Sequence, residues 1–206
     1  MMLKRKNIEL GLLFGLIAAI LLSMARFDAS CEELRQNVLR LHIIANSDSK
    51  ADQEVKLAVR DAILEQGNEL FTDEIQLEEA LDIAERNTTL FCETAQRVLK
   101  ENGFEYSAQV SVGKSYFENR EYDDFTLPAG EYESLIIKLG EAKGKNWWCV
   151  VFPSVCIPAA ADSDLSDCAG EQSAHIAENA PKYVIRFKAV EIYENLRQFL
   201  EHKARK

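Results

Sequence analysis

Apolar and polar positions change their spacing within one stretch, LHIIANSDSKADQEVKLAVRD at 41–61. From 38 to 45 apolar side chains recur at every second position, which predicts a strand with one buried face. That face holds Leu39, Leu41, Ile43 and Ala45, and the opposite face holds Arg40, His42 and Ile44.

The polar run Asn-Ser-Asp-Ser at 46–49 ends this strand, because such side chains compete for backbone hydrogen bonds. Ser49, followed three positions later by Asp52, resembles a capping box and predicts the start of a helix. Apolar positions then recur at a helical spacing up to Ile63, and Gly67 is expected to end the helix.

A second helical pattern covers 75–100 and includes Cys92 in its apolar stripe, which predicts a buried thiol. Beyond it, strands are predicted at 106–112, 132–139, 147–152 and 183–187, and a last helix at 190–203. The order predicts an α+β domain, in which a mostly antiparallel sheet carries two helices on one face and the chain ends in a helix. Residues 159–181 are small and acidic without Lys or Arg, and we expect a mobile acidic loop.

The N-terminus has the pattern of an export segment. Basic residues at 4–6 precede an uncharged run over 10–25, and small residues at Ser23 and Ala25 are typical of a cleavage site. Residues 1–25 are therefore expected to be a signal peptide or a retained signal anchor, and both alternatives stay open. Residues 26–206 are expected to lie outside the cytoplasm in either case.

Composition excludes some functions. The 206 residues are 47% hydrophobic, enough for a substantial core, and their net charge of −10 without an internal basic cluster argues against nucleic-acid binding. The three histidines lack metal-ligand spacing, and no phosphate-binding glycine loop is present. We expect no metal and no cofactor.

Export permits disulfides, and the chain has five cysteines. Cys149 and Cys156 are the preferred pair, since Pro153 between them could turn the chain back. The alternative is two buried thiols.

The stretch at 41–61 also holds candidate chemistry. Ser47 and His42 could suggest a nucleophile and its base, but five residues across a strand end place them on opposite sides of the pleat. Asp52, Lys56 and Arg60 are spaced for helix ion pairs, as a solvated face or as a recognition stripe. Trp147 and Trp148 must point to opposite faces of their strand, so one could be an exposed binding anchor.

Two stretches that follow the export segment, LHIIANSDSKADQEVKLAVRDAILE at 41–65 and LPAGEYESLIIKLGEAKGKNWWCVVFPSVC at 127–156, together resemble the stage II sporulation protein R family. Ser154 departs from the second proline usual in that family, and the acidic loop has no counterpart in it. The resemblance implies a secreted, non-enzymatic messenger, released between the forespore and mother-cell membranes of an endospore-forming bacterium. Its partner would be a membrane-embedded aspartic protease, stage II sporulation protein GA, which cleaves the precursor of sigma-E.

We therefore expect the strand–helix junction and its neighbours to bind this partner. The expected residues are His42, Asn46, Ser47, Asp48, Asp52, Gln53, Lys56, Arg60, Trp147 and Trp148. Two rival interpretations are a cell-envelope hydrolase that uses His42 and Asp48, and a structural envelope protein with a retained anchor.

Overall fold

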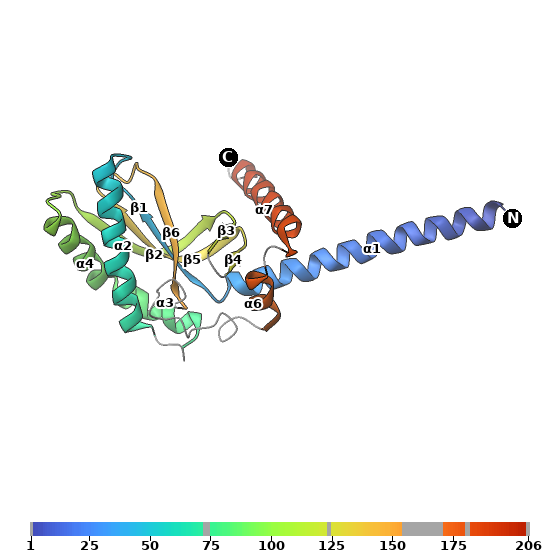
Figure 1. Ribbon diagram of the computed structural model, residues 1–206, viewed down its shortest axis with the longest axis horizontal. Coiled ribbons are helices and arrows are strands. Elements are labelled where there is room, and N and C mark those ends of the chain that lie inside the picture. The colour runs from blue at the N-terminus through green and yellow to red at the C-terminus, as the bar shows by residue number, and fades with distance from the viewer. Residues whose placement is uncertain (1, 72–74, 123–124, 154–170, 180–181, 205–206) are drawn as a thin grey trace.

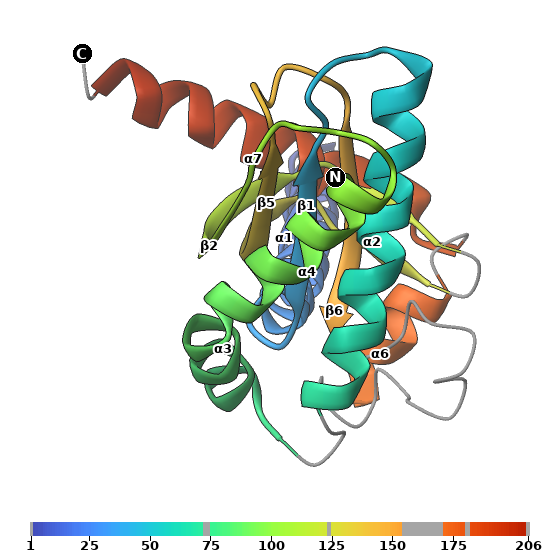
Figure 2. The ribbon, with the colours of Figure 1, turned by 90° about the vertical axis from the view of Figure 1, so that its left-hand side faces the viewer.

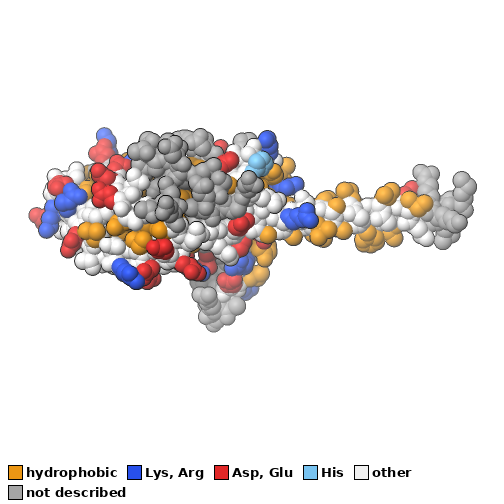
Figure 3. Space-filling view, turned by 90° about the horizontal axis from the view of Figure 1, so that it is seen from below, with side chains coloured by type: hydrophobic (Ala, Val, Ile, Leu, Met, Phe, Trp, Pro, Cys, Tyr) orange, Lys and Arg blue, Asp and Glu red, His pale blue; other side chains and the backbone are white. Residues whose placement is uncertain are grey.

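A long helix carries the folded part of the chain at one end (Figure 1). The structure is a computed structural model that describes residues 2–71, 75–122, 125–153, 171–179 and 182–204. Helix α1 (Met2–Arg35) is apolar and long enough over Asn7–Arg35 to cross a membrane. Its apolar side chains between Ile8 and Leu22 are exposed (Figure 3). We call this projecting part of α1 the shaft. The helix enters the folded domain further on, where Phe27, Cys31 and Leu34 are buried.

The main sheet of the folded domain has four strands in the order β2-β5-β1-β6. Their bounds are β1 (Leu39–Ile44), β2 (Ala108–Phe117), β5 (Gly130–Leu139) and β6 (Asn146–Phe152). Strand β1 pairs in parallel with β5 and antiparallel with β6, and β2 pairs antiparallel with β5. The predicted α+β class is confirmed, but the sheet is mixed because its two central strands are parallel. Strands β3 (Arg120–Glu121) and β4 (Thr126–Leu127) form a separate ribbon.

Three helices cover one face of the sheet, where two were predicted (Figure 2). They are α2 (Lys50–Leu70), α3 (Leu77–Arg86) and α4 (Thr88–Glu101). The single helix predicted over 75–100 is interrupted at Asn87, which separates α3 from α4. Helix α2 does not end at Gly67. A Cβ there would lie 2.8 Å from Val151 Cγ2, so this glycine allows the helix to pack closely on β6.

The predicted alternation along β1 is confirmed. Leu39, Leu41 and Ile43 are fully buried under α2 and α4 in the main core. Cys92 is only partly buried, and its thiol donates to the Ala108 carbonyl across 3.4 Å. The main core therefore lies where the apolar strand face meets the apolar helix faces.

The other face of the sheet is also covered, although its β1 residues are mostly polar. Arg40 is fully buried there, with its guanidinium 3.9 Å from the Phe117 ring centroid and 4.9 Å from that of Tyr132. It also donates to the Tyr122 hydroxyl across 2.7 Å. Aromatic faces attract a guanidinium, so the rings replace part of the solvation that Arg40 loses.

The C-terminal part differs from its prediction in two ways. Residues 171–178 form helix α6 (Glu171–Glu178) inside the segment predicted as a loop, while 154–170 and 180–181 lie outside the described residues. The strand predicted at 183–187 is wrong, because this sequence forms the start of helix α7 (Val184–Ala204). Helices α6 and α7 both pack against the base of α1.

Candidate functional site

The strand–helix junction, residues 45–56, is fastened to the turn at 140–145 between β5 and β6. Gly144 N donates to the Ala45 carbonyl across 2.9 Å, and Lys143 N donates to the Asn46 carbonyl across 3.2 Å. A Cβ at Gly144 would lie 2.2 Å from the Ser47 carbonyl oxygen. Only glycine therefore allows the two segments to come so close.

Asp52 is the centre of the junction. Its side chain is 5% exposed. Its carboxylate accepts hydrogen bonds from Ser47 Oγ at 2.5 Å, Tyr106 OH at 2.7 Å and Asn46 Nδ2 at 3.1 Å. The helix start is capped as predicted, since Ser49 Oγ accepts from Asp52 N at 3.1 Å. The Asp52 carboxylate does not complete the predicted capping box and instead joins β1, α2 and Tyr106.

The electrostatics of this carboxylate favour its charged form. Burial alone would raise the pKa of Asp52, but the hydrogen bonds from Ser47, Tyr106 and Asn46 outweigh it and hold the pKa below its usual value. Burial and the bond to Asp52 raise the pKa of Tyr106, so its hydroxyl stays a proton donor. Asp52 is thus a buried anion that organises the donors around it.

Asn46 bridges this network to the turn. Its Oδ1 accepts from Glu141 N at 2.9 Å, while its Nδ2 is the donor to Asp52. The side chain lies over Gly140, which has a φ of +56° and whose added Cβ would lie 2.2 Å from Asn46 Oδ1. Gly140 is therefore required both by its backbone conformation and by the space that Asn46 occupies.

Polar groups further along α2 also bond inward. Lys56 is 4% exposed, and its Nζ donates to Gln53 Oε1 at 2.7 Å and to the Lys145 carbonyl at 3.0 Å. Burial lowers the pKa of Lys56, and the nearby Asp48 opposes this shift. Gln53 Nε2 donates to the Ser47 carbonyl at 2.9 Å, and Asp48 Oδ1 accepts from Lys145 N at 2.7 Å. The predicted ion pair between Asp52 and Lys56 is absent from the described residues, because each side chain bonds across to another segment.

Comparison with known proteins identifies the group to which this architecture belongs. Residues 35–162 match the family described as stage II sporulation protein R. The chain belongs to the stage II sporulation protein R family. It is 33% identical over 150 residues to stage II sporulation protein R of Bacillus subtilis (strain 168), covering 70% of this chain and 67% of that relative. No solved structure matches. The family segment contains the sheet and the junction, whereas most of α1 and all of α6 and α7 lie outside it.

Two further candidates in this family segment extend the junction along α2. The Arg60 guanidinium lies 4.6 Å from the ring centroid of Trp147, and Arg60 also pairs with Asp61 at 2.5 Å. The Arg60 side chain is 22% exposed and Trp147 is partly buried. Exposed residues Asp48, Ser49 and Lys50 form the tip of the junction.

His42 and Trp148 lie on the opposite sheet face, apart from the junction network. The two are register partners between β1 and β6, and their ring centroids are 6.1 Å apart. Phe117 packs beside both rings, and burial lowers the pKa of His42. The Ser47 hydroxyl donates to Asp52 and not to His42, so the catalytic pair that the residue types could suggest does not form. As predicted, the two tryptophans point to opposite faces, but both are partly buried, so neither is the exposed anchor that the sequence suggested.

Other predictions about site chemistry have mixed outcomes. Cys149 is buried in the main core, while Cys156 lies outside the described residues, so their pairing stays a prediction. Within the described ranges, no group of three or more His, Cys, Asp or Glu residues is arranged to hold a metal. Sequence reasoning missed Tyr106 and the turn as parts of the junction. The only signal was the two glycines at 140 and 144, which flank a turn directly before a strand.

Proposed function

We propose that this family member is an exported signal that activates the membrane-embedded aspartic protease stage II sporulation protein GA. That protease would then process the precursor of sigma-E, which couples gene expression in the mother cell to the forespore. Family membership supports the sporulation role. An apolar helix ahead of the domain is compatible with export by a signal peptide or anchor.

The protein would contact the protease through the tip of the junction and the adjoining side of α2. Asp48 and Lys50 are exposed at the tip, and Arg60 with Trp147 lies further along α2. Recognition residues on a rigidly held loop lose little conformational entropy on binding. The buried Asp52 network supplies this rigidity, and it is the observation on which the proposal rests.

The remaining candidates would act through this tip. Asn46, Ser47, Asp52, Gln53 and Lys56 bond inward and would position the tip. His42 and Trp148 pack together on the opposite sheet face and would hold β1 in place from that side. Activation requires only that this surface bind the active state of the protease more tightly than the inactive state.

Charge reversal at exposed Lys50 and at partly buried Arg60 tests this assignment without altering the Asp52 network. Lys50→Glu with Arg60→Glu should reduce processing of the sigma-E precursor in sporulating cells, because both positions would face the protease. The matched control is Arg97→Glu with Lys100→Glu, which reverses two exposed charges on α4.

Processing in cells with the control variant should equal that of the wild type. Both variants need a wild-type thermal midpoint and cellular level for the comparison. If cells with a folded Lys50→Glu, Arg60→Glu variant process the sigma-E precursor fully, the junction is not part of the surface that contacts the protease.

A further inference from the structure

Helix α7 exposes an apolar face that nothing in the described structure covers. Its exposed large apolar side chains lie on one side of the helix, two at its start and five between positions 192 and 200. They are Val184 at 63%, Ile185 at 86%, Ile192 at 60%, Tyr193 at 55%, Leu196 at 56%, Phe199 at 64% and Leu200 at 56%. A soluble protein seldom leaves so continuous a stripe in water without a partner.

The opposite face of α7 packs on the domain. Phe187, Val190 and Glu194 are buried. Tyr116 OH donates to Asn195 Oδ1 at 2.8 Å, and Asn119 Nδ2 donates to the Phe187 carbonyl at 3.2 Å. The helix is therefore fixed in orientation, and its apolar stripe points away from the sheet.

Helix α7 lies on the side of the domain from which α1 projects, and Tyr193 of its stripe lines a hollow together with Met24 and Ala25 of α1. Figure 1 shows α7 between the sheet and the shaft, and Figure 2 shows it extending sideways while α1 is seen nearly end-on. Ring contacts fix this crosswise arrangement, since Phe27 of α1 lies 5.7 Å from Tyr183 and 5.1 Å from Phe187 between centroids. If α1 enters a membrane along its axis, α7 lies along the surface of that membrane.

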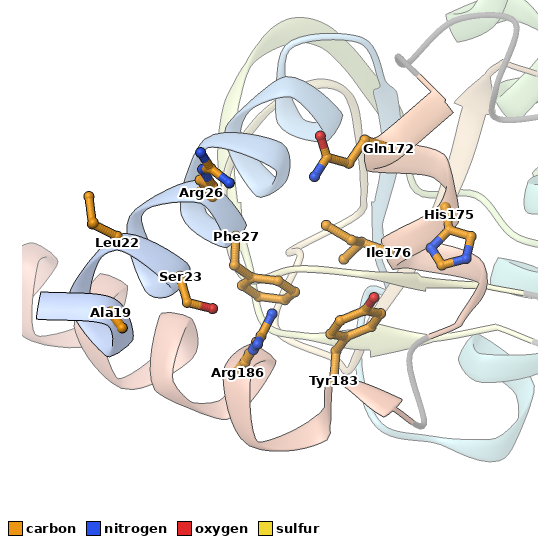
Figure 4. A pocket seen from close by; sticks show the side chains of 10 residues that line it. All are labelled: Ala19, Leu22, Ser23, Arg26, Phe27, Gln172, His175, Ile176, Tyr183 and Arg186. Atoms are coloured by element: carbon orange, nitrogen blue, oxygen red, sulfur yellow. The ribbon is translucent and has the colours of Figure 1, made fainter. Parts of the chain in front are cut away.

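A hollow of about 460 Å³ opens where α1, α6 and α7 meet (Figure 4). Arg26 and Arg186 line it together with Gln172 and His175. Neither arginine forms an ion pair with a carboxylate among the described residues, whereas the exposed apolar run of α1 ends immediately beside them at Leu22. Two unneutralised guanidiniums at the end of an apolar shaft suit the phosphate level of a bilayer.

The local charge agrees with this placement. Residues 182–206 contain seven Lys or Arg against three Glu, although the whole chain carries a net charge of −10. An excess of basic residues beside an apolar stripe is typical of helices that lie in the surface of anionic membranes. Pairing with a second copy through the same stripe would bring two such basic segments together, which disfavours that occupant.

We propose that α7 lies flat in the surface of an anionic bilayer, its apolar stripe among the acyl chains and Arg26 and Arg186 at the lipid phosphates. The domain would then be held at the membrane by two elements, the shaft and this crosswise helix. The lipid contact does not depend on the protease as partner. It would remain if α1 were cut near Ala25, since α7 follows that position in the chain.

Quenching by brominated lipid tests the placement in the full chain. Phe199→Trp puts a fluorophore on the stripe, and Glu201→Trp puts one nearby on the polar side as the matched control. The full-length variants are reconstituted in phosphatidylcholine vesicles with and without phosphatidylglycerol, with bromines near the headgroup end of the acyl chains. The wild type supplies the background of Trp147 and Trp148.

The position-199 signal should lose more than half its intensity in vesicles with phosphatidylglycerol, while the position-201 signal should change little. Arg26→Gln with Arg186→Gln should remove most of the dependence on phosphatidylglycerol. Equal quenching at the two positions, or none at either, would overturn the proposal. Unquenched, blue-shifted emission at position 199 together with dimers on crosslinking would assign the stripe to a second copy.

Discussion

The junction and α7 differ in which side chains they bury and which they expose. At the junction, polar groups that sequence patterns usually leave in water are buried and bonded to one another around Asp52. On one side of α7, apolar groups that usually enter a core are exposed at 184–185 and again at 192–200. Buried polar networks fix shape at a cost in solvation, whereas an exposed apolar stripe indicates a surrounding other than water. The junction thus fixes how β1 connects to α2, and α7 carries the proposed membrane contact.

The largest effect should come from Asp52→Ala. This change leaves three donors without their shared acceptor inside the domain, and the free energy of unfolding should fall by about 3 kcal/mol. Urea unfolding of the full chain in mild detergent, followed by tryptophan fluorescence, measures it. Asp82→Ala removes an exposed carboxylate that pairs with Arg86 on α3 and should cost less than about 0.5 kcal/mol. Similar losses in the two variants would mean that the buried network adds no stability.

Gly140→Ala should have the next largest effect, about 2 kcal/mol, from left-handed strain plus collision with Asn46. Gly103→Ala is a close control, because Gly103 also has positive φ but an added Cβ would meet nothing within 4 Å. That control should lose only about 1 kcal/mol by the same unfolding measurement. Equal losses would show that Asn46 moves aside freely and that the junction is not rigid.

Acid should weaken the junction selectively. The pKa of Asp52 is lower in the folded state than in the unfolded state, where it is about 3.9, so the folded state binds fewer protons. The stabilisation is complete above roughly pH 5 and is lost as the pH falls through the folded pKa. The stability difference between wild type and Asp52→Asn should therefore shrink on acidification. His42, whose pKa is also lowered, affects both proteins alike and cancels in this comparison. A difference that does not change with pH would contradict an ionised Asp52.

The smallest effect on stability should come from the stripe. Leu196→Ser with Leu200→Ser should change the free energy of unfolding in detergent by less than about 0.5 kcal/mol, because both side chains are already exposed. A loss of several kcal/mol would show instead that the stripe is covered in the folded chain, and the contrast between the two regions would disappear.

Patterns over a few turns predicted local structure well but did not predict how segments meet. The alternation along β1 and the Ser49 cap were correct, since both depend on neighbours in sequence. The strand predicted at 183–187 was wrong, because β-favouring residues there continue into a helix that packs on Phe27. Local β propensity is easily overridden by such packing.

The candidate site shows the same limit. The sequence indicated that polar residues end strand β1. It also suggested that Asp52 and Lys56 belong to a solvated helix face. Their burial depends on Tyr106 and Lys145, which are distant in sequence and are brought close by the parallel pairing of β1 with β5. No spacing within α2 encodes those partners. Arg40 illustrates the point again, since its partners in the interior are the rings of Phe117 and Tyr132 and the hydroxyl of Tyr122, all distant in sequence.

The most direct test of the central claim is site-specific photo-crosslinking in sporulating cells. A photoreactive residue in place of Lys50 at the junction tip should form an adduct with the membrane-embedded protease that processes the sigma-E precursor. The same residue in place of Glu93, exposed on α4, should form none. An adduct at position 93 but not at position 50, with both proteins folded and exported, would contradict the junction as the surface through which this protein signals.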